Sequence, residues 1–291
     1  MNSLAAVRYP ITGIGILNSL ASAAGLEVTC GVRYREGPRG LLDVYAPKEA
    51  AGAPMVVFFY GGGWESGERA DYRFAAVALA KRGFVVAVPD YRVYPEARYP
   101  DFLIDGAKAV RWARRHAGEF GGDPGLLFLI GHSAGAYIAT MLALDTRWLD
   151  TECLAALAGA VGLAGPYDFL PLRSQVLNDV FAPAGELASS QPITYARANA
   201  APLLLLSGMT DKTVSPGNSR RLAGRILALG GEAEARFYPH ANHVLILGSF
   251  SPLLRPIAPA LRHTASFIAA RAHNFRPKPG SPHFFRTTPL P

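Results

Sequence analysis

The sequence predicts an α/β fold in which a mostly parallel central sheet is covered by helices on both faces. Short runs of almost continuous apolar residues alternate with longer helical patterns, and such runs are typical of strands buried on both faces. Glycine-rich or polar loops directly follow several of these runs, and in parallel sheets the functional loops lie at the carboxyl ends of the strands. We therefore expect four loops to share one edge of the sheet: 60–64, 131–135, 208–211 and 239–243.

Each element follows from its local pattern. Residues 26–46 predict two strands, because extended patterns lie on either side of turn-forming residues 37–40. The later strands are expected at the mostly apolar runs 55–60, 84–88, 126–130, 157–163, 203–207 and 233–238. Helices, some of them followed by a terminating glycine, are expected at 71–82, 101–119, 136–144, 216–229 and 257–272.

Composition limits the class of protein. Half of the 291 residues are apolar and the mean hydropathy is +0.15, so the chain can bury a substantial core. The net charge of +7 comes from scattered basic residues and not from a dense stripe with interleaved aromatics, which argues against nucleic-acid binding. Cys30 and Cys153 fit neither a disulfide framework nor a zinc pattern. No apolar run is long enough to span a bilayer, so we expect no stable membrane insertion.

Residues 131–135 carry the strongest chemical motif, Gly-His-Ser-Ala-Gly. An apolar strand precedes it and an apolar helical run follows it, and strand, sharp turn and helix are the context of a nucleophilic serine. The turn would lift Ser133 above the sheet and direct the N-terminus of the helix at the group that Ser133 attacks. The alternative is a plain glycine-rich loop between a strand and a helix.

A nucleophilic serine needs a base, and in folds of this kind the chain order is serine, acid, histidine. His243 follows the last predicted strand, where that order requires it, and opens the apolar run 244–247. His240 is the competing candidate, although Pro239 directly precedes it. The two histidines have no third ligand at suitable spacing, so we expect no metal site.

The acid is expected at Asp211, which follows the penultimate strand and could accept the Nδ1–H of the base. The alternative role of Asp211 is to cap the helix that starts near Pro216. Asp168, at the end of the preceding strand, is the competing acid, but it lies beside Tyr167 in a loop that leads into a predicted helical cap.

An oxyanion formed by the reaction would need hydrogen-bond donors, and the glycines at 61–63 leave backbone N–H groups free to point into the site. We expect Gly62, Gly63 and Ala134 to supply these N–H groups. A phosphate-binding glycine loop is the rival interpretation, but the continuation typical of such loops is missing, because Trp64 follows the glycines.

These motifs together resemble the esterase and lipase branch of the α/β-hydrolase superfamily, with the hormone-sensitive-lipase-like and kynurenine-formamidase-like families nearest. The similarity runs from about residue 40 to 270. It includes a loop similar to His-Gly-Gly-x-Trp at 60–64, a segment similar to Asp-Tyr-Arg-Leu-x-Pro-Glu at 90–96, and the serine motif. Tyr60 stands where the family usually has the histidine that holds the glycine loop. A tyrosine hydroxyl can replace it only if a partner lies within reach.

The resemblance implies an α/β-hydrolase fold and a serine carboxylesterase acting on small, partly apolar esters through Ser133, His243 and Asp211. Trp64 and Tyr60 are then expected to contact substrate. The alternative is an arylformamidase that uses the same residues on N-formylkynurenine, and a more distant one is a non-catalytic binding protein. No cofactor is implied, the expected partner is a small-molecule ester, and a homodimer is left open.

One catalytic domain is expected at 26–272, with a helical cap inserted at about 166–201, where prolines interrupt the alternation of strands and helices. Residues 1–25 are expected to form an N-terminal helical segment, in which 21–23 weakly resemble a signal-cleavage site. Residues 273–291 are expected to be a Pro-rich basic tail. We expect a cytoplasmic protein, with secretion or a periplasmic location as the alternative.

Overall fold

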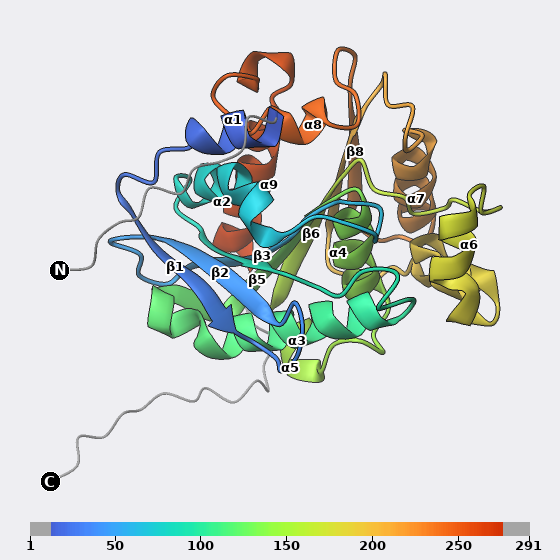
Figure 1. The fold of residues 1–291 in the computed structure, drawn as a ribbon, viewed down its shortest axis with the longest axis horizontal. Helices are drawn as coiled ribbons and strands as arrows, with labels where there is room; N and C mark the ends of the chain where they lie inside the picture. The colour runs from blue at the N-terminus through green and yellow to red at the C-terminus, as the bar shows by residue number, and fades with distance from the viewer. Residues whose placement is uncertain (1–12, 276–291) are drawn as a thin grey trace, which may run out of the picture.

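The computed structural model describes residues 13–275, and its centre is an eight-stranded sheet in the order β1-β2-β4-β3-β5-β6-β7-β8 (Figure 1). The strands are β1 Leu26–Arg33, β2 Leu41–Pro47, β3 Ala53–Phe59, β4 Val85–Pro89, β5 Gly122–His132, β6 Leu157–Leu163, β7 Leu203–Gly208 and β8 Ala233–Tyr238. The helices are α1 Gly13–Ser19, α2 Arg73–Ala80, α3 Asp101–His116, α4 Ala134–Leu144, α5 Thr151–Ala156, α6 Gln175–Phe181, α7 Gly217–Ala228, α8 Leu245–Gly248 and α9 Ala260–Asn274. This is the α/β-hydrolase fold that the motifs imply.

The sheet is parallel from β4 to β8, and the β1–β2 hairpin joins it through antiparallel pairing of β2 with β4. Because the parallel strands run the same way, their carboxyl ends meet at one edge, and the four loops that we expected together do begin there. Strands β4, β6 and β7 are buried along their whole length, which explains their unbroken apolar sequences.

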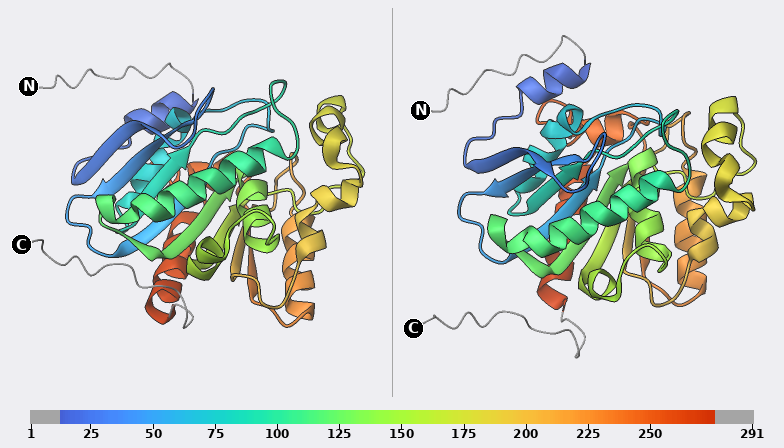
Figure 2. Two further views of the ribbon diagram at one scale, coloured as in Figure 1. Left: turned by 90° about the horizontal axis from the view of Figure 1, so that it is seen from below. Right: turned by 60° about the horizontal axis from the view of Figure 1, so that its bottom comes forward.

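Helices cover both faces of the sheet. On one face α2 packs near α9, and on the other α3 packs on α4 (Figure 2). Helix α4 is buried along its whole length between the sheet and its neighbours, so the run that follows the serine motif is apolar all round rather than amphipathic.

Some element boundaries differ from the predicted ones for local reasons. Strand β5 begins four residues earlier than predicted, because residues 122 and 123 pair with the start of β3 across a register shift. The helix predicted at 71–82 is divided into a 3-10 turn, Arg69–Tyr72, and α2. Helix α9 begins only at Ala260, because Pro259 disfavours a helical conformation of the residue before it, and Ala258 is extended.

The segments that we expected outside the sheet contain the following structure. Residues 166–201 hold α6 and three 3-10 turns, and α6 (yellow in Figure 2) stands at one end of the molecule near α7. Helix α1 is attached through Asn18, whose side chain bonds to backbone atoms of Ala70, Asp71 and Phe74. Residues 1–12 of the N-terminal segment and 276–291 of the tail lie outside the described residues. Within 13–275 no helix combines the length and apolarity needed to cross a bilayer.

Candidate active site

Ser133 lies in a sharp turn between β5 and α4, with φ 55° and ψ −120°. A positive φ is unusual for a residue with a side chain, and such strained conformations gather at functional sites. The flanking glycines allow the turn to pack closely. A Cβ on Gly131 would lie 2.1 Å from the carbonyl oxygen of Gly135, and a Cβ on Gly135 would lie 2.1 Å from that of Phe59. The glycine spacing of the motif therefore has a steric cause.

The structure brings three predicted residues together at the carboxyl edge of the sheet. His243 Nε2 lies 2.8 Å from Ser133 Oγ, and His243 Nδ1 lies 2.8 Å from Asp211 Oδ2. The Asp211 side chain is fully buried, whereas the side chain of His243 keeps 13% of its surface exposed. An imidazole that contacts both a hydroxyl and a buried carboxylate can accept the hydroxyl proton, because the carboxylate stabilises the imidazolium that forms.

Asp211 is held in position by its own loop. Its Oδ1 accepts hydrogen bonds from the backbone N–H groups of Thr213 and Val214, at 2.8 and 2.9 Å, which leaves Oδ2 for His243. Burial alone would raise the pKa of Asp211, but the hydrogen bonds from His243 and these two N–H groups outweigh it and hold the pKa below its usual range. The carboxylate therefore stays ionised beside the histidine.

The two competing candidates lie elsewhere. Asp168 makes a salt bridge to Arg221 of α7, so its carboxylate is engaged there. His240 is exposed at the start of the loop that follows β8. The helix-capping role considered for Asp211 does not occur, because α7 begins at Gly217 with Pro216 as its N-cap residue.

His132, directly before the serine, is a site residue that sequence reasoning missed. Its Nε2 lies 2.8 Å from the backbone oxygen of His243, and the two imidazole ring centroids are 5.0 Å apart. Burial lowers the pKa of His132 to about 4, with a further contribution from the charge of His243. The pattern could have indicated this residue only by its place in the motif.

The glycine loop packs directly against the serine turn. A Cβ on Gly61 would lie 3.1 Å from the Cβ of Ser133. Gly62 has φ 134°, and a Cβ there would lie 2.1 Å from the backbone oxygen of Ser66, so the tight turn requires glycine. Ala134 is the first residue of α4, where backbone N–H groups have no acceptor within the helix. The predicted N–H donors thus belong to two segments that meet at Ser133.

Tyr60 differs from its predicted role as a substrate contact, because its side chain is completely buried. Its hydroxyl accepts a hydrogen bond from Arg39 Nη2 at 2.8 Å and donates one to Asp90 Oδ1 at 3.1 Å. The same Arg39 nitrogen donates to the backbone oxygen of Gly67, beyond the glycine loop. Burial and the negative charge of Asp90 raise the pKa of Tyr60, so its hydroxyl keeps the proton that it donates. Tyr60 therefore has the partner that a replacement for the usual histidine requires.

Trp64 also differs from its predicted role as a substrate contact. Its side chain is only 4% exposed, and its ring lies within about 6 Å of four other aromatic rings: Phe102, Tyr137, Phe169 and Phe181. Two of these rings come from 166–201. Trp64 thus joins the glycine loop to the predicted cap.

We expect Tyr60→Phe to lower kcat about tenfold with little change in KM. The substitution removes the hydroxyl between Arg39 and Asp90. An unpaired buried polar group lowers the free energy of unfolding by about 1–3 kcal/mol. Without this hydroxyl the glycine loop should also shift from its place beside Ser133, which lowers kcat. Steady-state kinetics on a short-chain p-nitrophenyl ester and urea unfolding measure the two effects.

The matched control is Tyr238→Phe, which removes a hydroxyl bonded to His263 Nδ1 at 2.7 Å, away from the glycine loop. This variant should lose stability but keep its kcat. If Tyr60→Phe also keeps the wild-type kcat, the hydroxyl of Tyr60 contributes only to the stability of the fold.

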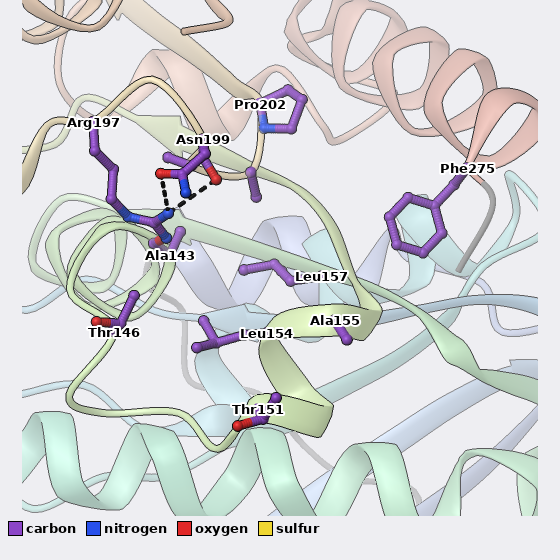
Figure 3. Close-up of a pocket in the computed structure, with 12 residues that line it drawn as sticks. Ala143, Thr146, Thr151, Leu154, Ala155, Leu157, Arg197, Asn199, Pro202 and Phe275 are labelled. Atoms are coloured by element: carbon purple, nitrogen blue, oxygen red, sulfur yellow. Dashed lines mark hydrogen bonds between the residues drawn. The ribbon is translucent and has the colours of Figure 1, made fainter. Parts of the chain in front are cut away.

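A cavity of about 380 Å³ lies at the opposite end of the parallel strands, near the start of β6 and β7 (Figure 3). Its lining combines polar and apolar residues, and one of the polar ones, Arg197, is already bonded through Nη1 to the side chain and the backbone oxygen of Asn199. The residues that line it include none from the serine turn, the glycine loop or the loops of Asp211 and His243, so this cavity is separate from the site at Ser133.

The fold and the geometry around Ser133 define a class: the chain is an α/β-hydrolase superfamily protein of the esterase branch. More particularly, a family model described as BD-FAE matches residues 42–226, and the chain belongs to that family.

Similar proteins agree with this class. An isoprenylcysteine alpha-carbonyl methylesterase of Arabidopsis thaliana is 29% identical over 243 residues, which cover 75% of this chain and 56% of the relative. A kynurenine formamidase of Salmo salar is 32% identical over 168 residues, covering 57% of this chain and 55% of the relative. The chain thus spans about half the length of these curated relatives. Esterase 2 of Thermogutta terrifontis, solved with propionate bound, superposes with a TM-score of 0.69 at 26% identity, covering 86% of this chain and 95% of the other.

Proposed function

We propose that this chain is a serine carboxylesterase that hydrolyses small, partly apolar carboxylic esters. The observation that carries the proposal is the pair of 2.8 Å hydrogen bonds that links Ser133 through His243 to Asp211. Membership of the BD-FAE family and the likeness to an esterase of known structure support it.

In the first half of the reaction Ser133 Oγ attacks the ester carbonyl carbon while His243 Nε2 takes the hydroxyl proton. The carbonyl electron pair moves onto the oxygen, where the N–H groups of Gly62, Gly63 and Ala134 stabilise the charge. Collapse of this intermediate breaks the bond to the alcohol oxygen, which leaves with the proton from His243. The product is an acyl ester of Ser133.

In the second half a water molecule takes the place of the alcohol. His243 accepts its proton, the hydroxide adds to the acyl carbon, and the bond to Ser133 Oγ breaks as the proton returns to it. Asp211 remains ionised throughout and stabilises the imidazolium. The acid product is released and the serine is regenerated.

Exposed apolar side chains beside the site support an apolar substrate. Met209, two residues before Asp211, is 59% exposed, and Val244, directly after His243, is 65% exposed. An apolar acyl or alcohol group bound beside Asp211 and His243 would shield these side chains from water. The relative of known structure holds propionate, a short acid, which supports small acyl groups.

Formamide hydrolysis is the second candidate, favoured by the similarity to a kynurenine formamidase. The same serine, base and N–H donors would serve, with the amine in place of the alcohol as leaving group. A non-catalytic binding protein is the remaining alternative, and the complete set of hydrogen-bonded groups at Ser133 argues against it.

A substrate panel tests the proposal. We expect kcat/KM to be highest for short-chain p-nitrophenyl and alkyl esters and lower for N-formylkynurenine on the same preparation. A fluorophosphonate reagent should add one mass increment at Ser133. Faster turnover of N-formylkynurenine would establish the formamidase instead. An unlabelled serine together with no turnover of any ester would overturn the catalytic proposal.

A further inference from the structure

His132 lies between three parts of the candidate site. It directly precedes Ser133, so its backbone belongs to the nucleophile turn. Its Nε2 reaches the backbone oxygen of His243 at 2.8 Å. On the other side of the ring, a Cβ on Gly61 would lie 2.9 Å from His132 Nδ1, so the glycine loop is in close contact with it. One side chain therefore touches the loop of the base and the loop of the oxyanion donors.

The contact with the backbone oxygen of His243 determines which nitrogen of the His132 ring carries a proton. A carbonyl oxygen only accepts hydrogen bonds, so His132 Nε2 carries the proton and donates it. Nδ1 is buried and has no hydrogen-bond partner among the described residues. A second proton there would create an unpaired buried cation, and the ionisable groups that face the ring are His243 and Asp211. The neutral Nε2–H tautomer therefore fits this environment.

We propose that His132 is a positioning residue, whose Nε2–H fixes the backbone of His243 at the place from which the imidazole reaches Ser133 Oγ. This role rests on the proposed esterase function and adds to it a residue outside the serine, histidine and acid. His132 does not touch the reacting atoms. It acts by limiting the movement of the 239–243 loop relative to the nucleophile turn.

The loop needs such a restraint because its tip is only partly buried. Asn242 and Val244, on either side of His243, are both exposed, so packing alone holds this part of the loop weakly. Asp211 fixes the imidazole at Nδ1, and the carbonyl contact of His132 fixes the backbone. Without this restraint on the backbone, the imidazole of His243 should shift relative to Ser133 Oγ. A misplacement of about 1 Å can lower the rate about 10²-fold.

Two substitutions separate the donor from the volume of the side chain. His132→Gln keeps an N–H donor at about the distance of Nε2, whereas His132→Met has similar reach and no donor. We expect His132→Met to lower kcat about 10- to 100-fold with KM nearly unchanged, and His132→Gln to recover most of that loss. His240→Gln, in the same loop but exposed, is the control and should behave as wild type.

A proton NMR signature separates positioning from general destabilisation. The far-downfield resonance of the proton shared by His243 and Asp211 should be sharp in wild type and in His132→Gln. In His132→Met it should broaden or shift, because the base samples several positions. Circular dichroism and urea unfolding show whether each variant is folded, and the kinetics are compared only among folded variants.

Each outcome has one interpretation. If His132→Gln and His132→Met lose kcat equally while both stay folded, or if neither loses any, the positioning role is wrong. A loss confined to KM would also overturn it. These results are distinct from failure of the esterase proposal, which would appear as absent turnover and absent fluorophosphonate labelling in the wild-type protein.

Discussion

Replacing Ser133 with alanine should abolish ester hydrolysis, with kcat falling by at least about 10³-fold. Comparable removals of a catalytic serine cost up to about 10⁶-fold, because water then has to attack without a covalent intermediate. The proposed N–H donors of Gly62, Gly63 and Ala134 are untouched by the substitution, and we expect the residual rate to reflect them alone. The measurement is the initial rate on a short-chain p-nitrophenyl ester, together with KM or a substrate-analogue affinity to show that binding survives.

Ser266→Ala, at an exposed serine of α9, provides the control for the Ser133 variant. It should keep both the wild-type rate and the fluorophosphonate label, whereas Ser133→Ala should lose both. A Ser133→Ala protein that still hydrolyses esters at the wild-type rate would place the chemistry on another residue.

Removing the imidazole of His243 should cost nearly as much as removing the serine, about 10³-fold or more in kcat. Ser133 Oγ would keep its proton at neutral pH, because no other imidazole lies within hydrogen-bond distance of it in the described part of the chain. His240→Ala is the matched comparison three residues away, and its kcat should stay within about twofold of wild type, as for an exposed surface substitution.

Added imidazole offers a chemical check on the His243 prediction. It should restore part of the activity of His243→Ala and none of the activity of Ser133→Ala, since a free base can replace the missing proton acceptor but not the nucleophile. The opposite ranking of the two histidine variants would assign the base to His240.

The sequence was sufficient to predict the architecture because parallel strands buried on both faces have a distinctive composition. Strands β6 and β8 have the predicted bounds, and the fold class is confirmed. The start of β5 was missed because Gly122–Asp123 pairs with β3 through contacts that no local pattern encodes. The order of residues along the chain and their positions after strand ends also predicted Ser133, Asp211 and His243 as site residues. In the structure, His243 lies within hydrogen-bonding distance of both Ser133 and Asp211.

The surroundings of these residues could not be predicted in the same way. Tyr60 and Trp64 follow a strand like residues that face a site, yet both are buried. Their environment depends on segments far along the chain: Tyr60 bonds to Arg39 and Asp90, and Trp64 packs on Phe181 of α6. Contacts over 21 to more than 100 residues leave no periodic trace in the sequence.

The bonding of Tyr60 has a consequence for comparing and engineering related sequences. Arg39 lies in the turn between β1 and β2, so a residue of this antiparallel hairpin helps to hold the glycine loop in position. Exchanging Tyr60 alone for the histidine usual at that position would leave the guanidinium of Arg39 with a different neighbour. Positions 39 and 60 therefore form one unit of substitution, to be exchanged together when the loop is grafted or when homologous sequences are aligned.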